Sequence, residues 1–230
     1  MNLWTFVLLG FLAHSCSGQI AVNETALIAK CKETLRNTFA KNEGSALAPI
    51  AISGNTKATP TCKGYNSLNI SVTKRSDGYY SFECHGPVAV TSQKTTGELV
   101  LGLNVKATLS LDLVDGVLKF TLVKTAEVTT SVLQTVTGLV GGILQILGGI
   151  LQTVLGLFTK SCKEGVEEQG KLGLATALNT INADLQILLG SLTAGVSSAA
   201  ENILTLLPLG FVPVGQNGGS PCTCGTGQGP

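Results

Sequence analysis

The fold is organised by one stretch without a charged residue, from Val128 to Thr159, which reads VTTSVLQTVTGLVGGILQILGGILQTVLGLFT. Its apolar residues recur at alternating gaps of three and four positions, a spacing that places them on one stripe of a helix. The six glycines within it each cost about 1 kcal/mol relative to alanine in a helix interior, so helix propensity alone does not favour this helix. The pattern predicts an apolar helix over residues 131–159 that other elements, or lipid, must cover on most sides.

The block before this helix, residues 66–129, predicts an antiparallel sheet. Apolar and polar residues alternate from Leu68 to Val72 and again from Tyr80 to Cys84, which is the signature of a hairpin. A longer alternation runs from Leu99 to Leu113, and after a turn another continues from Leu118 to Val128. We expect the apolar face of this long hairpin to pack along the apolar helix.

Helical patterns also flank the sheet and the apolar helix. Residues 19–44 hold a first helix, whose periodic positions run from Asn23 to Lys41. Residues 172–207 hold a second long, amphipathic helix, which Pro208 ends. The predicted fold class is therefore α+β: a long curved antiparallel sheet of about four to five strands around the apolar helix, with an N-terminal helix and a second long C-terminal helix.

Less regular segments complete the predicted domain, which spans residues 19–209. Residues 45–64, punctuated by Pro49, Gly54 and Pro60, predict a loop with one short strand around Ile50–Ile52. Residues 159–170 are rich in lysine and glutamate, which predicts a solvated connection between the two helices. From residue 210 to residue 230, Gly, Pro, Ser, Gln and Asn dominate, which is typical of a flexible tail.

The order of these parts resembles the tubular lipid-binding superfamily, which contains the BPI, PLUNC, takeout and mite group-seven allergen proteins. The resemblance covers roughly Asn23 to Phe158 and rests on Leu47-Ala48-Pro49-Ile50 ahead of the sheet, the hairpin from Leu99 to Val128, and the Leu/Gly-rich segment Gly138 to Leu157. It implies a strongly curved sheet that wraps a long helix and leaves an apolar tunnel for lipid. The chain departs from the family in its helical pattern after Leu172 and in its number of cysteines.

A secretory route is predicted from the N-terminus and from the cysteines. Residues 1–18 contain an apolar run followed by small residues, as in a signal peptide cleaved after Gly18, although the start lacks the usual basic residue. An even number of cysteines in a secreted chain predicts up to three disulfides, and the adjacent pair in the C-x-C is too close to bond internally without strain. The six candidates are Cys31, Cys62, Cys84, Cys162, Cys222 and Cys224.

Two sequons predict N-linked glycosylation in that route. They begin at Asn23 and Asn69, and Asn69 falls on the polar side of its predicted strand. The expected protein is therefore a secreted, extracellular glycoprotein.

Charge and motifs argue against several classes of function. Lys and Arg number 15 against 14 Asp and Glu, so no electrostatic case exists for a nucleic-acid partner. His85 is the one histidine left after removal of the signal, and no hydrolase, zinc-protease or phosphate-loop motif is present. The sequence therefore predicts no enzyme, no catalytic residue, no metal and no cofactor. Asp77 and Asp115 each precede a glycine and indicate turns, and Cys84 beside His85 favours a disulfide next to a strand-end histidine.

The apolar stripes have two interpretations, a packed core or an apolar tunnel that binds a lipid or acyl chain. A related possibility is surface activity, in which the apolar helices spread at a membrane or air–water interface. The alternatives are a matrix, silk, glue or shell component that self-associates through disulfides, and a bilayer span over Val136 to Phe158. The tunnel candidates are Leu101, Leu103, Val105, Leu109, Leu111, Leu118, Phe120, Leu122, Val136, Val140, Ile143, Leu147, Ile150 and Val154.

Overall fold

The computed structural model describes residues 19–22, 24–53, 55–114, 117–140, 150–195 and 211–214. The chain divides into two compact units, one made of Met1–Leu27 with Gly195–Pro230 and the other of Ile28–Ala194. The predicted signal peptide, the Asn23 sequon and the C-x-C cysteines lie outside the described residues.

The first unit contains a short two-stranded ribbon. Strand β1 (Gln19–Val22) pairs antiparallel with β12 (Phe211–Val214), and Gln19 lies opposite Val214. Aromatic and β-branched residues favour extended backbone, which explains a strand at the start of the segment that the composition predicted to be flexible. The remainder of that tail lies outside the described residues.

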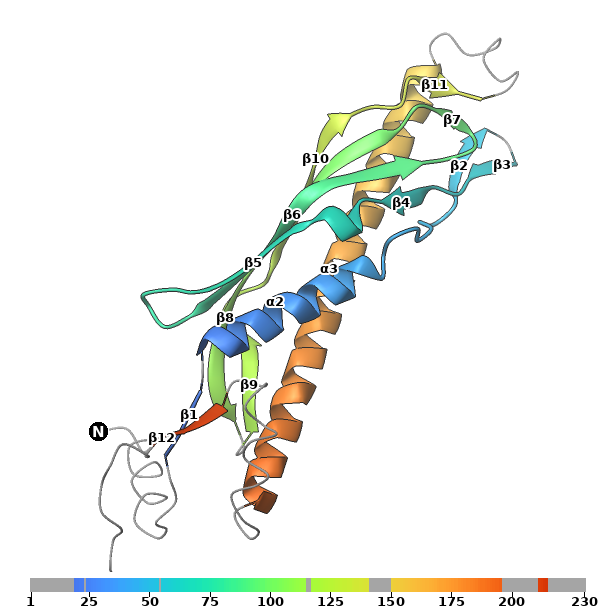
Figure 1. Ribbon diagram of the computed structural model, residues 1–230. Helices are drawn as coiled ribbons and strands as arrows, with labels where there is room; N and C mark the ends of the chain where they lie inside the picture. The colour runs from blue at the N-terminus through green and yellow to red at the C-terminus, as the bar shows by residue number, and fades with distance from the viewer. Residues whose placement is uncertain are drawn as a thin grey trace, which may run out of the picture. The chain divides into compact units, whose positions relative to one another are not determined.

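The second unit is built on a curled antiparallel sheet (Figure 1). Its strands follow the order β10-β8-β6-β4, β5 also pairs with β6, and β9 also pairs with β8. The sheet therefore has six strands instead of the expected four to five. The strands are β4 (Thr61–Lys63), β5 (Asn69–Lys74), β6 (Tyr80–Thr91), β8 (Leu99–Val114), β9 (Val117–Leu122) and β10 (Glu127–Gln134).

Two small ribbons and a turn of 3-10 helix accompany this sheet. Strand β2 (Ile50–Ser53) confirms the short strand expected near Ile50 and pairs with β3 (Thr56–Ala58). Strand β7 (Thr95–Thr96) pairs with β11 (Gly138–Leu139), and η1 (Tyr65–Ser67) follows β4.

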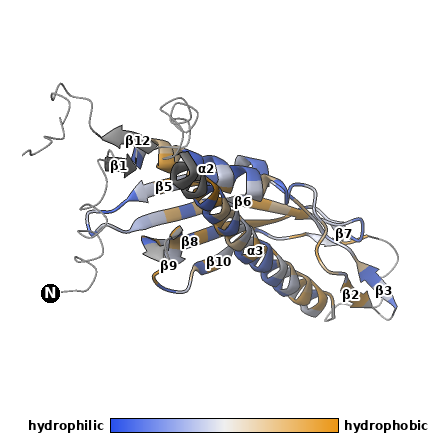
Figure 2. Ribbon diagram, turned by 90° about the horizontal axis from the view of Figure 1, so that it is seen from below, coloured by the Kyte–Doolittle hydropathy of each residue, from blue (hydrophilic) through white to orange (hydrophobic). Residues whose placement is uncertain are grey.

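The two faces of the sheet follow the alternation of the sequence. In the β6–β8 pair, Tyr80 lies opposite Leu109, Cys84 opposite Val105 and Val90 opposite Leu99, and all six side chains are buried. The intervening residues are mostly polar and half-buried or exposed. Figure 2 shows this change of hydropathy along β6 and β8. The hairpin of Leu68–Val72 with Tyr80–Cys84 is confirmed by the pairing of β5 with β6, and its apolar face belongs to the core of this unit. The arm expected from Leu118 to Val128 is instead divided between β9 and β10, which both pair with β8.

The first helix is also confirmed, as α2 (Glu24–Ala40). Leu27, Cys31, Leu35 and Phe39 recur every four residues and are all buried, with at most 3% of each side chain exposed. A four-residue spacing keeps these side chains on one face of the helix.

The second helix is longer than the sequence predicted. Helix α3 (Ile150–Gly195) runs without a break for 46 residues, through the segment 159–170 that was expected to be a solvated connection. That expectation was wrong because the charges sit on one side only: Cys162, Val166 and Gly170 continue a buried stripe with a spacing of four. The part of the expected helix after residue 195 lies outside the described residues.

The predicted apolar helix over residues 131–159 is wrong in its first part. Residues up to Gln134 belong to β10, where Val128 lies opposite Val105 and Val132 opposite Leu101. The cause is local composition, because Val and Thr dominate here and their branched side chains favour strands. Residues 141–149 lie outside the described residues, and the helix begins at Ile150.

Helix α3 lies against the apolar face of the sheet and approaches it closely at Gly170. A Cβ atom at this position would lie 2.9 Å from Val128 Cγ1 and 3.4 Å from Leu103 Cδ1. Further along, the Asn182 side chain accepts a hydrogen bond from Phe120 N at 2.7 Å and donates one to Phe120 O at 3.0 Å. The helix is therefore held to the sheet by close packing at Gly170 and by the Asn182 side chain, which makes both backbone hydrogen bonds of Phe120 that a neighbouring strand would otherwise make.

The close approach at residue 170 leads to a stability prediction. Gly170→Leu should lower the free energy of unfolding by about 1–3 kcal/mol, because overpacking against stiff neighbours exceeds the gain in helix propensity. Gly156→Ala is the matched control: nothing lies within 4 Å of a Cβ there, so stability should rise by about 0.5–1 kcal/mol. Denaturant unfolding measures both, and equal stability of the two variants would contradict the close contact.

Candidate functional site

Most of the predicted tunnel residues lie in the packed core. Leu101, Leu103, Val105, Leu109, Phe120 and Val154 are buried, with 0–8% of each side chain exposed. Leu111 and Leu118 are half-buried, whereas Leu122 and Val140 are about half exposed. Ile143, Leu147 and the side chain of Ile150 lie outside the described residues. Val136 is the tunnel candidate that lines the groove described next.

A groove of about 630 Å³ lies between the end of β10, with the residues that follow it, and the first turns of α3. Both walls come from the uncharged stretch Val128–Thr159, which forms a strand on one side and a helix on the other. Its volume falls within the range of small-molecule sites, about 300–1,000 Å³. It is lined by Val132, Thr135, Val136, Gln152, Leu155, Gly156, Thr159, Lys160, Lys163, Glu164 and Glu167.

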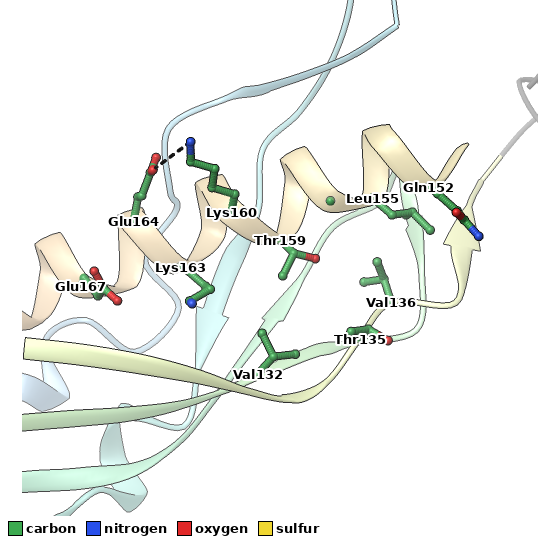
Figure 3. Close-up of a pocket in the computed structure, with 11 residues that line it drawn as sticks. Val132, Thr135, Val136, Gln152, Leu155, Thr159, Lys160, Lys163, Glu164 and Glu167 are labelled. Atoms are coloured by element: carbon green, nitrogen blue, oxygen red, sulfur yellow. Dashed lines mark ion pairs between the residues drawn. The ribbon is translucent and has the colours of Figure 1, made fainter. Parts of the chain in front are cut away.

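The two walls face each other across an apolar space (Figure 3). From the strand side, Val132 and Val136 point toward the helix, and Leu155 and Thr159 point back toward them. Gly156 adds room, because nothing lies within 4 Å of where its Cβ would be. This arrangement can accommodate an apolar chain along the helix.

The charged residues of the groove are gathered at one end. Glu167 Oε1 accepts hydrogen bonds from Thr130 N at 3.0 Å and Thr130 Oγ1 at 2.8 Å, which fixes the carboxylate to β10. Lys160 pairs with Glu164 at 3.9 Å on the other side of the helix (Figure 3). The half-buried Lys163 points into the space between the walls.

The charged lining residues were missed by sequence reasoning. Lys160, Lys163, Glu164 and Glu167 fall in the segment that was predicted to be a connection, so no helix face was assigned to them. Phe158, Cys162 and Val166 are spaced by four residues, and this spacing indicates that the helix continues through the charged segment.

A second depression, of about 600 Å³, lies elsewhere on the second unit. It is lined by Thr59, Thr61, Thr91, Lys57 and Lys94, with Ser92 and Gln93. Its lining is hydroxyl-rich and lacks apolar side chains, so it does not suit the hydrophobic ligand that the sequence predicts.

Four of the six disulfide candidates are free cysteines in the structure. Cys31, Cys62, Cys84 and Cys162 are buried and unpaired. They lie at core-facing positions on α2, β4, β6 and α3, where a free cysteine acts as a small apolar residue, and their pairing in disulfides stays a prediction. Burial raises the pKa of each thiol from 9.0 to about 12, which makes the thiolate, the reactive form, scarce.

Cys84 and His85 do not form a catalytic pair. As neighbours in β6 they point to opposite faces of the sheet, with Cys84 buried and His85 exposed. His85 Nε2 lies 3.4 Å from Asn69 Nδ2 on the outer face. Asn69 is exposed there, so its position is compatible with the glycosylation that remains a prediction. Within the described residues, no cluster of His, Cys, Asp and Glu could hold a metal ion.

No protein-family model matches this sequence, and no curated protein matches it either. The helices formed by described residues do not combine the length and apolar composition that crossing a bilayer requires. The groove between β10 and α3 is therefore interpreted from the geometry and chemistry of this chain alone.

The burial of the thiols can be tested by alkylation. Iodoacetamide at about pH 8 should leave Cys31, Cys62, Cys84 and Cys162 unmodified in the folded protein and should modify all four after unfolding. Peptide mass spectrometry reads each residue separately. Disulfide-linked peptides containing two of the four would contradict the structure.

The raised thiol pKa values also predict a dependence of stability on pH. Between pH 9, where unfolded thiols titrate, and about pH 12, where buried ones do, the unfolded chain loses protons that the folded chain keeps. The free energy of unfolding contributed by the thiols is therefore fully present below pH 9 and falls as pH rises. Denaturant unfolding of wild type and Cys84→Ala across this pH range measures how much the Cys84 thiol contributes to the pH dependence of stability. If the free energy of unfolding falls equally with pH in both proteins, the raised pKa of Cys84 is contradicted.

Proposed function

We propose that this protein is a secreted, non-enzymatic carrier that binds a hydrophobic ligand, a lipid or acyl chain, in the groove between β10 and α3. One observation carries the proposal: apolar side chains on both walls, with Val132 and Val136 opposite Leu155, line an open groove of about 630 Å³ that the core does not fill. Each methylene that an acyl chain buries there contributes about 0.8 kcal/mol. A chain of ordinary length therefore gains enough from burial to bind without many polar contacts.

Exposed apolar side chains favour action at an interface as part of the same function. Leu133 and Leu157, on the two elements that form the groove, are 61% and 54% exposed. A contiguous patch of such side chains would mark a surface that meets a membrane or another apolar phase. A carrier that takes its ligand from such a phase needs them near the groove. These exposed side chains bear on how the ligand would be taken up and delivered. The proposed binding site is still the groove.

Filling the groove tests the proposal. Gly156→Leu places a Cβ where nothing lies within 4 Å and extends the side chain from the groove lining, so it should weaken binding of a fluorescent acyl probe about tenfold or more, the loss of about 1.4 kcal/mol. Ala175→Leu adds the same side chain at an exposed position of α3 outside the groove and should leave the affinity unchanged.

Probe titration and native mass spectrometry with lipid extraction are the two readouts. A wild-type protein that binds no acyl probe and retains no lipid would contradict the proposed function. Equal affinity in wild type and Gly156→Leu would show that the ligand binds outside the groove. Disulfide-linked multimers on a non-reducing gel would instead favour the matrix component considered from the sequence.

A further inference from the structure

We infer that the ligand is a single-chain amphiphile with a carboxylate head group, a long-chain fatty acid anion, and that its head group pairs with Lys163. This inference rests on the proposed function, because it assumes that an acyl chain occupies the groove. It adds the chemical class of the ligand and its direction along α3.

Lys163 is a lining lysine whose ammonium has no direct partner among the described residues, unlike that of Lys160. No hydrogen bond or ion pair joins Lys163 to another described residue. The carboxylate four residues away, Glu167, is held by two hydrogen bonds from Thr130. Lys160 and Glu164 pair with each other on the other side of the helix. The half-buried ammonium of Lys163 therefore faces the apolar space and can pair with an anion there.

The charge balance favours a carboxylate over a phosphate. The two lysines and two glutamates of the lining sum to zero charge, and Lys163 offers a head group one ammonium, whereas a phosphate monoester carries about −1.5 to −2 at neutral pH. The carboxylate of Glu167 lies at the same end of the groove and repels each further negative charge. A monoanionic head group is therefore the better match to this end of the groove.

The groove has a polar end and an apolar end, which sets the direction of the chain. Lys163 and Glu167 lie at one end, and Leu155 and Val136 lie toward the other, where Gln152 closes the lining. From Lys163 to Gln152 the helix rises about 16 Å at 1.5 Å per residue. An acyl chain whose carboxylate sits at Lys163 would thus extend along the apolar walls, with its tail toward Gln152.

The test compares two ligands with the same chain and different head groups, palmitate and hexadecanol. In competition with a fluorescent acyl probe, wild type should bind palmitate about tenfold more tightly than hexadecanol. Lys163→Gln should remove that advantage and change hexadecanol binding less than about twofold. The matched control is Lys171→Gln, an exposed lysine of α3 outside the groove, which should bind both ligands as wild type does. The preference for palmitate should also shrink as salt is added, because screening weakens the ion pair.

The outcomes separate this inference from the proposed function. If wild type and Lys163→Gln bind palmitate and hexadecanol equally well, the head-group inference is overturned and the acyl-chain site stands. If neither ligand displaces the probe from wild type, the proposed function itself fails. An equal loss of both ligands in Lys163→Gln would mean that Lys163 packs without pairing, and tighter binding of lysophosphatidate than of palmitate would overturn the carboxylate assignment.

Discussion

The structure of the second unit depends on one close contact, the approach of α3 to the apolar face of the sheet at Gly170. A Cβ at this position would lie 2.9 Å from Val128, so the backbone of the helix meets side chains of the sheet directly. Because interiors are close-packed, a side chain at residue 170 would push the helix away from the sheet. The hydrogen bonds of Asn182 to Phe120 and of Glu167 to Thr130 then hold the helix on both sides of the contact.

This packing explains why the space for a ligand lies at the margin of the sheet. The side chains of Leu101, Leu103 and Leu109 are almost completely buried, since the helix and the sheet face fill each other. Where β10 ends, the strand diverges from the helix (Figure 3), and Gly156 contributes no side chain to the gap. The lining of the groove therefore combines apolar residues of the strand with both apolar and charged residues of the helix.

Part of the candidate site could be predicted from the sequence and part could not. The stretch Val128–Thr159 was identified by its lack of charge, and it does supply both apolar walls of the groove. The charged end was missed because Lys163 and Glu167 were assigned to a connection, although Cys162 and Val166 keep the helical spacing there. The predicted disulfides stay a prediction: the four described cysteines are free thiols in the structure, and an even count alone cannot distinguish bonded cysteines from small core residues.

By itself, the sequence determined the alternating apolar face of the strands and helix α2, because a period of two residues or of about four dominates these segments. The sequence could not determine where the strand ends and the helix begins within Val128–Thr159. The apolar residues there fit both the period of a strand and the period of a helix. Only the tertiary structure decided that junction: pairing of Val128 and Val132 with β8 makes the first part a strand. The tertiary structure also decided that α3 continues through its charged segment, because the buried side chains of Phe158, Cys162 and Val166 lie together against the core only if the helix is continuous.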